Sequence, residues 1–263
     1  MTSKESEGEN VREAVTAAKK LSDEASALVQ AAASDGVPLR LLGATAFVLR
    51  CPKYAHWHDS FERVLTDIDF VTYTKYRDKV DQILASRGYE SPRLLTLWAP
   101  HDRFIVEHPE KKIHVDVFFD KLTMCHEIDF RGRLEKEDLT IPLADMFLEK
   151  MQIVRINEKD INDVIILLRE HSLGNDAINI EYIAQLLSKD WGFFHTVEKN
   201  LGTVRDSLSR YDFLSKEDRL DIESKIDSIM KDLQDEPKTM KWRMRNKVGE
   251  SKIWYNEVEE VQR

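Results

Sequence analysis

Two aspartates, separated by one residue, interrupt an otherwise apolar stretch. Asp67 and Asp69 lie within residues 65–73, a run typical of an interior β-strand. Successive side chains of a strand point to opposite faces, so both carboxylates are expected on one face. Adjacent like charges on a buried strand repel, and a divalent cation is the strongest counter-charge available. The pair is therefore a candidate Mg²⁺ or Mn²⁺ site, with a solvated edge strand as the alternative.

A third aspartate occupies the centre of another apolar stretch. Asp116 lies within residues 113–119, a second predicted strand in which a lone charge is costly. Three acids on neighbouring strands would form an oxygen-ligand site that can hold hard cations and position a triphosphate. His114 shares the face of Asp116 and is either a site residue or a hydrogen-bonded structural histidine. Asp120 either joins that face or ends the strand.

A glycine separates the apolar run at residues 39–42 from a predicted helix through Ala46 and Phe47. Gly43 would let the backbone come close to a phosphate, and the following helix N-terminus would offer N–H groups to an anion. A plain turn is the alternative interpretation of this single glycine.

The elements that must position these residues alternate along the first half of the chain. They predict an α/β (α+β) fold with a mixed sheet, because helices and strands interleave. A domain of residues 1–133, which begins with a helix at 11–33, precedes an all-helical domain of residues 134–263. Further helices are expected at 75–87, 143–154, 159–171, 180–190, 193–211 and 215–233, and further strands at 94–98 and 103–107.

Taken in order, three short motifs resemble the signature of the DNA polymerase β-like nucleotidyltransferase superfamily. They are Gly43-Ala44-Thr45, Asp67-Ile68-Asp69 with Arg63 before it, and Val115-Asp116-Val117. Residues 141–151, followed by Arg155 and residues 159–163, resemble the helical motif of the abortive-infection toxin branch of that superfamily. The resemblance covers roughly residues 39–171.

The resemblance implies a nucleotidyltransferase core and roles for particular residues. Asp67, Asp69 and Asp116 would be catalytic and bind metal, and the nucleotide would be bound by Gly43, Ala44, Thr45, Lys150 and Asp160. Members usually carry Gly-Ser or Gly-Gly where this chain has Gly43-Ala44, so a phosphate-contacting hydroxyl would come from Thr45 or be missing. As alternatives, Lys150 lies on a solvated helix face and Asp160 is a helix N-cap.

The implied activity is transfer of a nucleoside monophosphate from a nucleoside triphosphate to an acceptor hydroxyl. The acceptor is not specified by the sequence; tRNA, another RNA, a protein and a small molecule all fit the chemistry. The alternative is a catalytically inactive nucleotide- or protein-binding module on the same fold. A toxin or antitoxin-like role is a further interpretation.

The composition and net charge of the chain indicate its cellular compartment and the partners that are not expected. The 263 residues carry a net charge of −9, so the whole chain is not attracted to nucleic acid or an anionic membrane. The chain lacks a secretory signal pattern and a long apolar run, which predicts a cytoplasmic protein without membrane contact. Residues 56–58, His-Trp-His, resemble a zinc site only in composition and are expected to form a polar loop.

A local basic stretch is the exception to the acidic charge. Residues 238–247 interleave cations with Trp242, a composition that can grip phosphates and stack on a base. The alternative is an amphipathic helix that packs Trp242 and Met244 inward. The chain lacks the glycine-rich and catalytic motifs of phosphate-loop kinases, Rossmann enzymes, serine hydrolases and common zinc proteases, which removes support for these classes.

Overall fold

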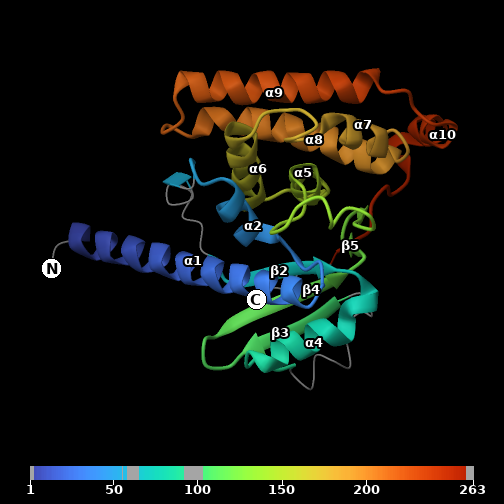
Figure 1. Ribbon diagram of the computed structural model, residues 1–263. Helices are drawn as coiled ribbons and strands as arrows, with labels where there is room; N and C mark the ends of the chain where they lie inside the picture. The colour runs from blue at the N-terminus through green and yellow to red at the C-terminus, as the bar shows by residue number, and fades with distance from the viewer. Residues whose placement is uncertain (1–2, 55, 58–64, 92–102, 259–263) are drawn as a thin grey trace. The chain divides into compact units, whose positions relative to one another are not determined.

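The chain begins with a long helix. The structure is a computed structural model that describes residues 3–54, 56–57, 65–91 and 103–258, with the backbone alone for residues 3–15. Helix α1 spans Ser3–Ser34 and confirms the helix predicted at residues 11–33 (Figure 1). Ala25, Leu28 and Ala32 are fully buried at helical spacing, so one stripe of α1 packs against the rest of the first half.

Within the described residues, four strands form one mixed sheet in the order β1-β2-β4-β3. β2 and β4 are parallel, whereas β1 pairs with β2 and β3 pairs with β4 in antiparallel fashion. The predicted interior position of β2 and the α/β class are confirmed, while the strand predicted at 94–98 lies outside the described residues. The bounds are β1 Arg40–Leu42, β2 Asp67–Thr72, β3 Arg103–His108 and β4 Ile113–Phe119.

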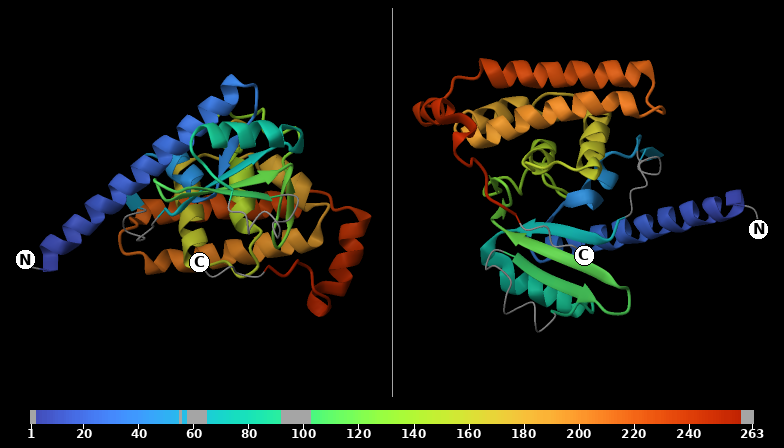
Figure 2. Two further views of the ribbon diagram at one scale, coloured as in Figure 1. Left: turned by 90° about the horizontal axis from the view of Figure 1, so that it is seen from below. Right: turned by 180° about the vertical axis from the view of Figure 1, so that it is seen from behind.

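Helices α1 and α4 cover one face of this sheet. A 3₁₀ turn, Thr74–Tyr76, leads into α4, Arg77–Ser86, and Gly88 follows in the left-handed conformation at φ +86°. The guanidinium of Arg77 lies over the rings of Phe104 and Phe119, which places the start of α4 on their side of the sheet. α1 contacts α4, β1 and β2, and Figure 2 shows both helices on that side.

The two faces of the sheet differ in exposure. On β2 and β4, residues 68, 70, 115 and 117 are fully buried. The side chains between them point the other way, because a strand has a period of two. That second face carries Asp67, Asp69 and Asp116 and is called the acid face below. Asp67 and Asp69 are half-buried and keep access to solvent, whereas Asp116 is buried.

Contacts divide the chain into two compact units. The first comprises Met1–Leu122 with Asp129–Pro142, and the second comprises Thr123–Ile128 with Leu143–Arg263. A two-stranded sheet of β5, Lys121–Thr123, and β6, Glu127–Asp129, was not predicted. The predicted domain boundary between residues 133 and 134 stays a prediction.

The second unit contains the helices expected after residue 133. α8 and α9 run beside each other in both views of Figure 2. Side-chain caps begin most of these helices: Asn157 starts α6, Asn179 starts α7, Asp190 starts α8, Ser215 starts α9 and Thr239 starts α10. The bounds are α5 Leu143–Met151, α6 Glu158–Glu170, α7 Ile180–Leu187, α8 Trp191–Ser207, α9 Lys216–Asp235 and α10 Met240–Val248. Across the described residues, no helix combines the length and apolarity needed to cross a membrane.

Candidate functional site

Asp67 and Asp69 lie on β2 at alternate positions, and both are partly exposed. In the parallel pairing of β2 with β4, Asp67 is opposite His114 and Asp69 is opposite Asp116. Paired residues share a face, so the three predicted acids lie on neighbouring strands of the acid face. The solvated edge-strand alternative is wrong, because β1 and β4 flank β2.

Gly43 brings the backbone against one of these acids. It is the first residue of helix α2, Gly43–Arg50, and has φ +70°. A Cβ built on Gly43 would collide with Oδ2 of Asp69 and lie 3.0 Å from its Cγ. The plain-turn alternative does not explain this close approach, which only glycine permits. The N-terminus of α2 therefore lies beside the Asp69 carboxylate.

The next two residues continue α2. Ala44 is half-buried, and Thr45 is almost fully buried. The Thr45 hydroxyl donates a hydrogen bond to the carbonyl oxygen of Asp67 at 3.2 Å. This hydroxyl therefore links α2 to the start of β2. Leu42, the N-cap residue of α2, makes no side-chain capping hydrogen bond.

Asp116 has a cationic partner that the sequence did not reveal. Its buried carboxylate forms an ion pair with the guanidinium of Arg103, which is about a third exposed. Arg103 starts β3, pairs with Phe118 in the antiparallel register and lies over that ring at 5.3 Å. The ion pair compensates the charge of Asp116 within the fold.

The acid face only partly meets the requirements of a divalent cation. Asp67 and Asp69 supply partly exposed carboxylates on one face, which suits a hard ion. Asp116, however, is held by Arg103. Among the side chains that the structure describes, no group of three or more histidine, cysteine, aspartate or glutamate residues is arranged to hold a metal ion. The fit therefore rests on the first two aspartates.

His114 and Asp120 mark the two ends of the same strand. His114 is exposed, and its Nε2 lies 3.7 Å from Oε1 of Glu107 on β3. Asp120 ends the strand, as one of the two predictions stated: it has φ +61°, and its carboxylate accepts hydrogen bonds from the backbone N–H and the hydroxyl of Thr74 at 3.1 and 2.6 Å. The carboxyl ends of β2 and β4 are thereby fastened together.

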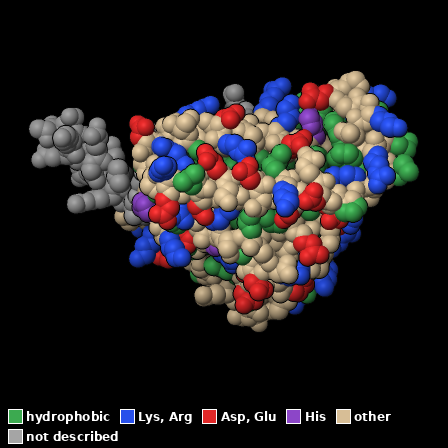
Figure 3. Space-filling model, turned by 90° about the horizontal axis from the view of Figure 1, so that it is seen from above, with side chains coloured by type: hydrophobic (Ala, Val, Ile, Leu, Met, Phe, Trp, Pro, Cys, Tyr) green, Lys and Arg blue, Asp and Glu red, His purple; other side chains and the backbone are tan. Residues whose placement is uncertain are grey.

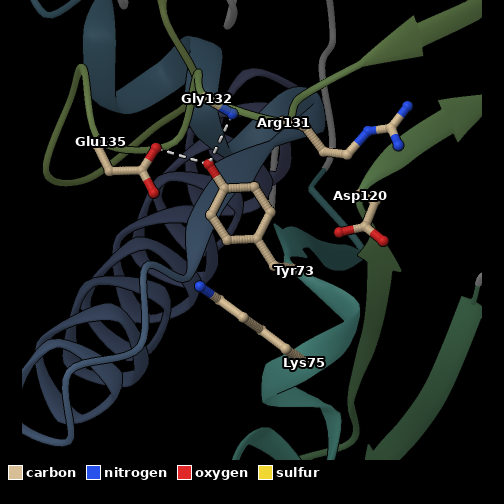
Figure 4. Close-up of a pocket in the computed structure, with 6 residues that line it drawn as sticks. All are labelled: Tyr73, Lys75, Asp120, Arg131, Gly132 and Glu135. Atoms are coloured by element: carbon tan, nitrogen blue, oxygen red, sulfur yellow. Dashed lines mark hydrogen bonds between the residues drawn. The ribbon is translucent and has the colours of Figure 1, made fainter.

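A hollow of about 410 Å³ lies at these carboxyl ends. Figure 4 shows Tyr73 in the middle of the residues that line it, with Lys75 on one side of the ring. The Tyr73 hydroxyl donates to Oε2 of Glu135 at 2.6 Å and accepts the N–H of Gly132 at 3.1 Å. Burial raises the pKa of this hydroxyl, and the bond to Glu135 acts in the same direction. Asp120 and Arg131 complete the lining.

Lys150 lies in a buried ion cluster of the second unit. Its Nζ is 3.1 Å from Oδ1 of Asp160, 3.2 Å from Oδ2 of Asp163 and 3.9 Å from Oε1 of Glu149. None of these side chains is more than 9% exposed. The solvated-face alternative for Lys150 is therefore wrong. The N-cap alternative for Asp160 is wrong too, because Asn157 caps α6 and accepts the N–H of Asp160.

His126, a buried histidine of the second unit, is another residue that the sequence pattern did not indicate. The ring of His126 stacks on Phe193 at 4.8 Å, and its Nε2 lies 2.9 Å from the hydroxyl oxygen of Thr196. Burial lowers the pKa of His126 from 6.5 to about 4, although the charge of Asp190 acts in the opposite direction. The imidazole is therefore neutral in the folded protein at neutral pH.

Two sequence motifs lie partly outside the described residues. Arg63 and His58 lie outside the described residues. The predicted polar loop is wrong at His56 and Trp57, because both residues are helical and Trp57 is buried, with its ring centroid 4.6 Å from that of Tyr54.

A comparison of the chain with protein-family models finds no match, and neither do comparisons with curated proteins and with solved structures.

Proposed function

We propose that the chain is a nucleotidyltransferase of the DNA polymerase β-like superfamily, closest to the abortive-infection toxin branch. It would transfer a nucleoside monophosphate from a nucleoside triphosphate to an acceptor hydroxyl. The proposal is carried by the close approach of Gly43, at the start of α2, to the carboxylate of Asp69 on the acid face. A glycine-led helix N-terminus beside carboxylates provides an anion-binding element next to a site for hard cations.

Asp67 and Asp69 are the residues that would hold Mg²⁺ or Mn²⁺, because both are partly exposed on one face. A divalent cation bound there would neutralise triphosphate charge and stabilise the charge that develops during transfer. The backbone N–H groups of Gly43, Ala44 and Thr45, at the start of α2, are proposed to face the phosphates. Lys150 and Asp160 remain candidate nucleotide residues through the sequence resemblance alone.

The proposed reaction exchanges one phosphorus–oxygen bond for another. The acceptor oxygen bonds to the α-phosphorus while the bond from that phosphorus to the oxygen bridging to the β-phosphorus breaks, so pyrophosphate leaves. The acceptor proton passes to a carboxylate, and we assign this role to Asp116. Arg103 would hold that carboxylate in position until the proton arrives, because it pairs with Asp116 in the described structure.

The acceptor would be bound at the carboxyl ends of β2 and β4. Tyr73 and Asp120 follow directly after these two parallel strands. Open α/β sheets bind ligands at the carboxyl ends of parallel strands. We therefore place part of the acceptor, whether RNA such as tRNA, protein or small molecule, in the hollow around Tyr73.

A second candidate function is a binding module that has kept the fold without turnover. The Arg103–Asp116 ion pair favours it, because a guanidinium already provides the counter-charge that a cation would supply. Ala44 adds to this, since the superfamily usually has serine or glycine at that position.

The experiment measures transfer of label from each of the four α-phosphorus-labelled nucleoside triphosphates, with Mg²⁺, to components of a cell extract. The wild-type chain is compared with Asp69→Asn and with the control Asp78→Asn, on the exposed surface of α4. Labelled acceptor with wild type and control but not with Asp69→Asn supports the transferase. If wild type and control bind nucleotide equally but label no acceptor, the result supports the binding module. If they neither bind nucleotide nor label an acceptor, the result contradicts both functions.

Expression in cells tests the hypothesis that the chain acts as a toxin through the same function. Growth arrest caused by the wild-type chain and relieved by Asp67→Ala would support a toxin whose effect requires the acid face. Growth arrest that persists in the variant would assign the effect to another part of the chain.

A further inference from the structure

Helix α10 has a charge opposite to that of the chain as a whole. Its nine residues, Met-Lys-Trp-Arg-Met-Arg-Asn-Lys-Val, include four cations and no acid, while the chain carries a net charge of −9. The hydrophobic residues in this helix are spread among the cations.

One side of α10 is fastened to α8. The ring of Trp242 meets the ring of Phe194 edge-on at 5.2 Å, and Oδ1 of Asn246 accepts the indole N–H of Trp191 at 2.6 Å. Trp242 and Asn246 are four residues apart and so share a side of the helix. The predicted inward packing of Trp242 is confirmed.

The opposite side presents apolar side chains to solvent. Met240, Met244 and Val248, four residues apart, are 69%, 63% and 39% exposed and form one stripe along α10. The predicted inward packing of Met244 is therefore wrong. Ile253, also 69% exposed, lies in the following segment, which Arg245 holds by donating to the carbonyl oxygen of Lys252 at 2.7 Å. Met240, Met244 and Val248 are called the α10 stripe.

Cations border the α10 stripe on both sides. At about 100° per residue, Arg243 and Lys247 fall on one side of it and Lys241 and Arg245 on the other. Arg245 lies over the ring of Trp191 at 4.6 Å, and Arg243 donates to the carbonyl of Lys238. Blue and green side chains gather together at the right-hand end in Figure 3, where α10 lies. The α10 stripe is therefore an apolar ridge bordered by four cations of the same helix.

The chemistry of this ridge selects among possible partners. Exposed methionines adapt their shape to the apolar face of another helix. Nucleic acid fits less well, because Trp242, the aromatic residue that could stack on a base, faces α8 instead. A membrane surface fits less well too, because membrane-binding amphipathic helices usually bury a larger apolar face than three side chains supply.

We propose that the α10 stripe and its flanking cations form a docking surface for an amphipathic helix of a partner protein, one whose apolar face is bordered by aspartate and glutamate. The apolar contacts supply the binding energy, and the flanking charges select an acidic helix over a basic one. This proposal is independent of the nucleotidyltransferase function, because it uses no residue of the acid face.

The test titrates the full chain into a fluorescent synthetic helix with leucines at every fourth position and glutamates on both flanks, and follows anisotropy. A second helix with lysines in place of the glutamates is the matched probe. Wild type is expected to bind the acidic helix at least about tenfold more tightly than the basic one. Met244→Asp should weaken this binding by at least about tenfold, whereas Leu220→Asp, at an exposed position of α9, should leave it unchanged.

A charge-reversal variant separates the two contributions. Lys241→Glu with Lys247→Glu should weaken binding of the acidic helix and strengthen binding of the basic helix. Both substitutions are on exposed side chains, and circular dichroism checks that the fold is kept.

Several outcomes would overturn the proposal. One is failure to bind the acidic helix, and another is equal affinity for both helices. Tighter binding of single-stranded RNA or of phosphatidylserine vesicles, lost in the charge-reversal variant, would assign the surface to nucleic acid or lipid. Self-association of wild type in sedimentation, abolished by Met244→Asp, would instead make a second copy of the chain the occupant.

Discussion

The acid face and the buried ion cluster around Lys150 each combine several carboxylates with one cation, but they differ in access to solvent. On the acid face, Asp67 and Asp69 stay partly exposed and a glycine brings a helix N-terminus close. Around Lys150, by contrast, Asp160 and Asp163 are almost completely buried and lie at ion-pair distance from the ammonium group. Residue type alone therefore does not separate a ligand site from a structural ion network.

The physical difference is the state of the counter-charge. A buried carboxylate needs a permanent partner, because charge without compensation in a low-dielectric interior is costly. A partly exposed carboxylate is hydrated and can exchange water for a ligand. This comparison predicts that substitutions in the cluster act mainly on folding, while those on the acid face act mainly on cation and nucleotide binding.

The largest effect is expected for Lys150→Met. Removing the ammonium group leaves Asp160 and Asp163 buried without their cation, so the free energy of unfolding should fall by about 3–5 kcal/mol. Urea unfolding followed by circular dichroism measures this loss. Lys159→Met, at an exposed position nearby, is the control and should change stability by less than about 0.5 kcal/mol.

Unchanged stability of Lys150→Met would contradict the assignment of the cluster around Lys150 to a structural role. If the variant keeps wild-type stability but loses affinity for nucleoside triphosphates, Lys150 is a ligand residue, as the sequence resemblance implies, and the buried cluster is part of a binding site.

The buried His126 should make the free energy of unfolding depend on pH. Its pKa is lowered from 6.5 to about 4 by burial, so the unfolded chain takes up a proton at a higher pH than the folded chain does. The free energy of unfolding should therefore be highest above about pH 6.5 and fall between pH 6.5 and 4, by on the order of 3 kcal/mol. Unfolding midpoints across this range measure it.

The matched variant for this prediction is His126→Gln, which cannot titrate. Its free energy of unfolding should fall less steeply than that of wild type between pH 6.5 and 4. If the free energies of unfolding of the two proteins fall equally between pH 6.5 and 4, His126 does not account for the loss of stability in this range.

Gly43→Ala tests the close approach on the acid face. The added Cβ would collide with Asp69, and the φ of +70° adds backbone strain. Gly132→Ala is the control, since Gly132 has a similar φ of +72° but nothing within 4 Å of an added Cβ. Both variants should lose about 1–2 kcal/mol of stability from the left-handed backbone, and Gly43→Ala about 1–3 kcal/mol more from crowding.

A double substitution shows whether the extra loss comes from Asp69. Adding Asp69→Ala to Gly43→Ala should recover most of it, as measured in a thermodynamic cycle with the single variants. Equal losses for Gly43→Ala and Gly132→Ala would mean that the structure accommodates the Cβ, and that the glycine is not needed for proximity.

Local pattern was enough to predict the strands of the acid face. The apolar runs at residues 65–73 and 113–119 bracket β2 and match β4, and a period of two places Asp67 and Asp69 on one face whatever the rest of the fold does. The ion pair of Arg103 with Asp116 could not be predicted in this way. It depends on the antiparallel register of β3 with β4, which joins residues that no local pattern relates.

The second unit shows the same limit. Lys150 and Asp160 have the composition of a solvated helix surface, and the packing of α5 and α6 against each other and against neighbouring helices buries them. In α10, the sequence contains one large aromatic and two methionines, and helical spacing does not say which sector docks. The contacts of Trp242 and Asn246 with α8 decide it and turn Met244 outward.

The smallest expected effect concerns Arg103 and the cation. Arg103→Gln removes the guanidinium charge beside buried Asp116, so without metal the free energy of unfolding should fall by about 1–2 kcal/mol. If the acid face binds a divalent cation, millimolar Mg²⁺ should raise the unfolding temperature of this variant more than that of wild type, because the cation can replace the missing charge. Arg131→Gln, which removes an exposed ion pair with Asp129, should gain no such dependence. A Mg²⁺ response that is the same in all three proteins would mean that Asp116 belongs with Asp160 and Asp163, as a carboxylate held by a protein cation for structural reasons.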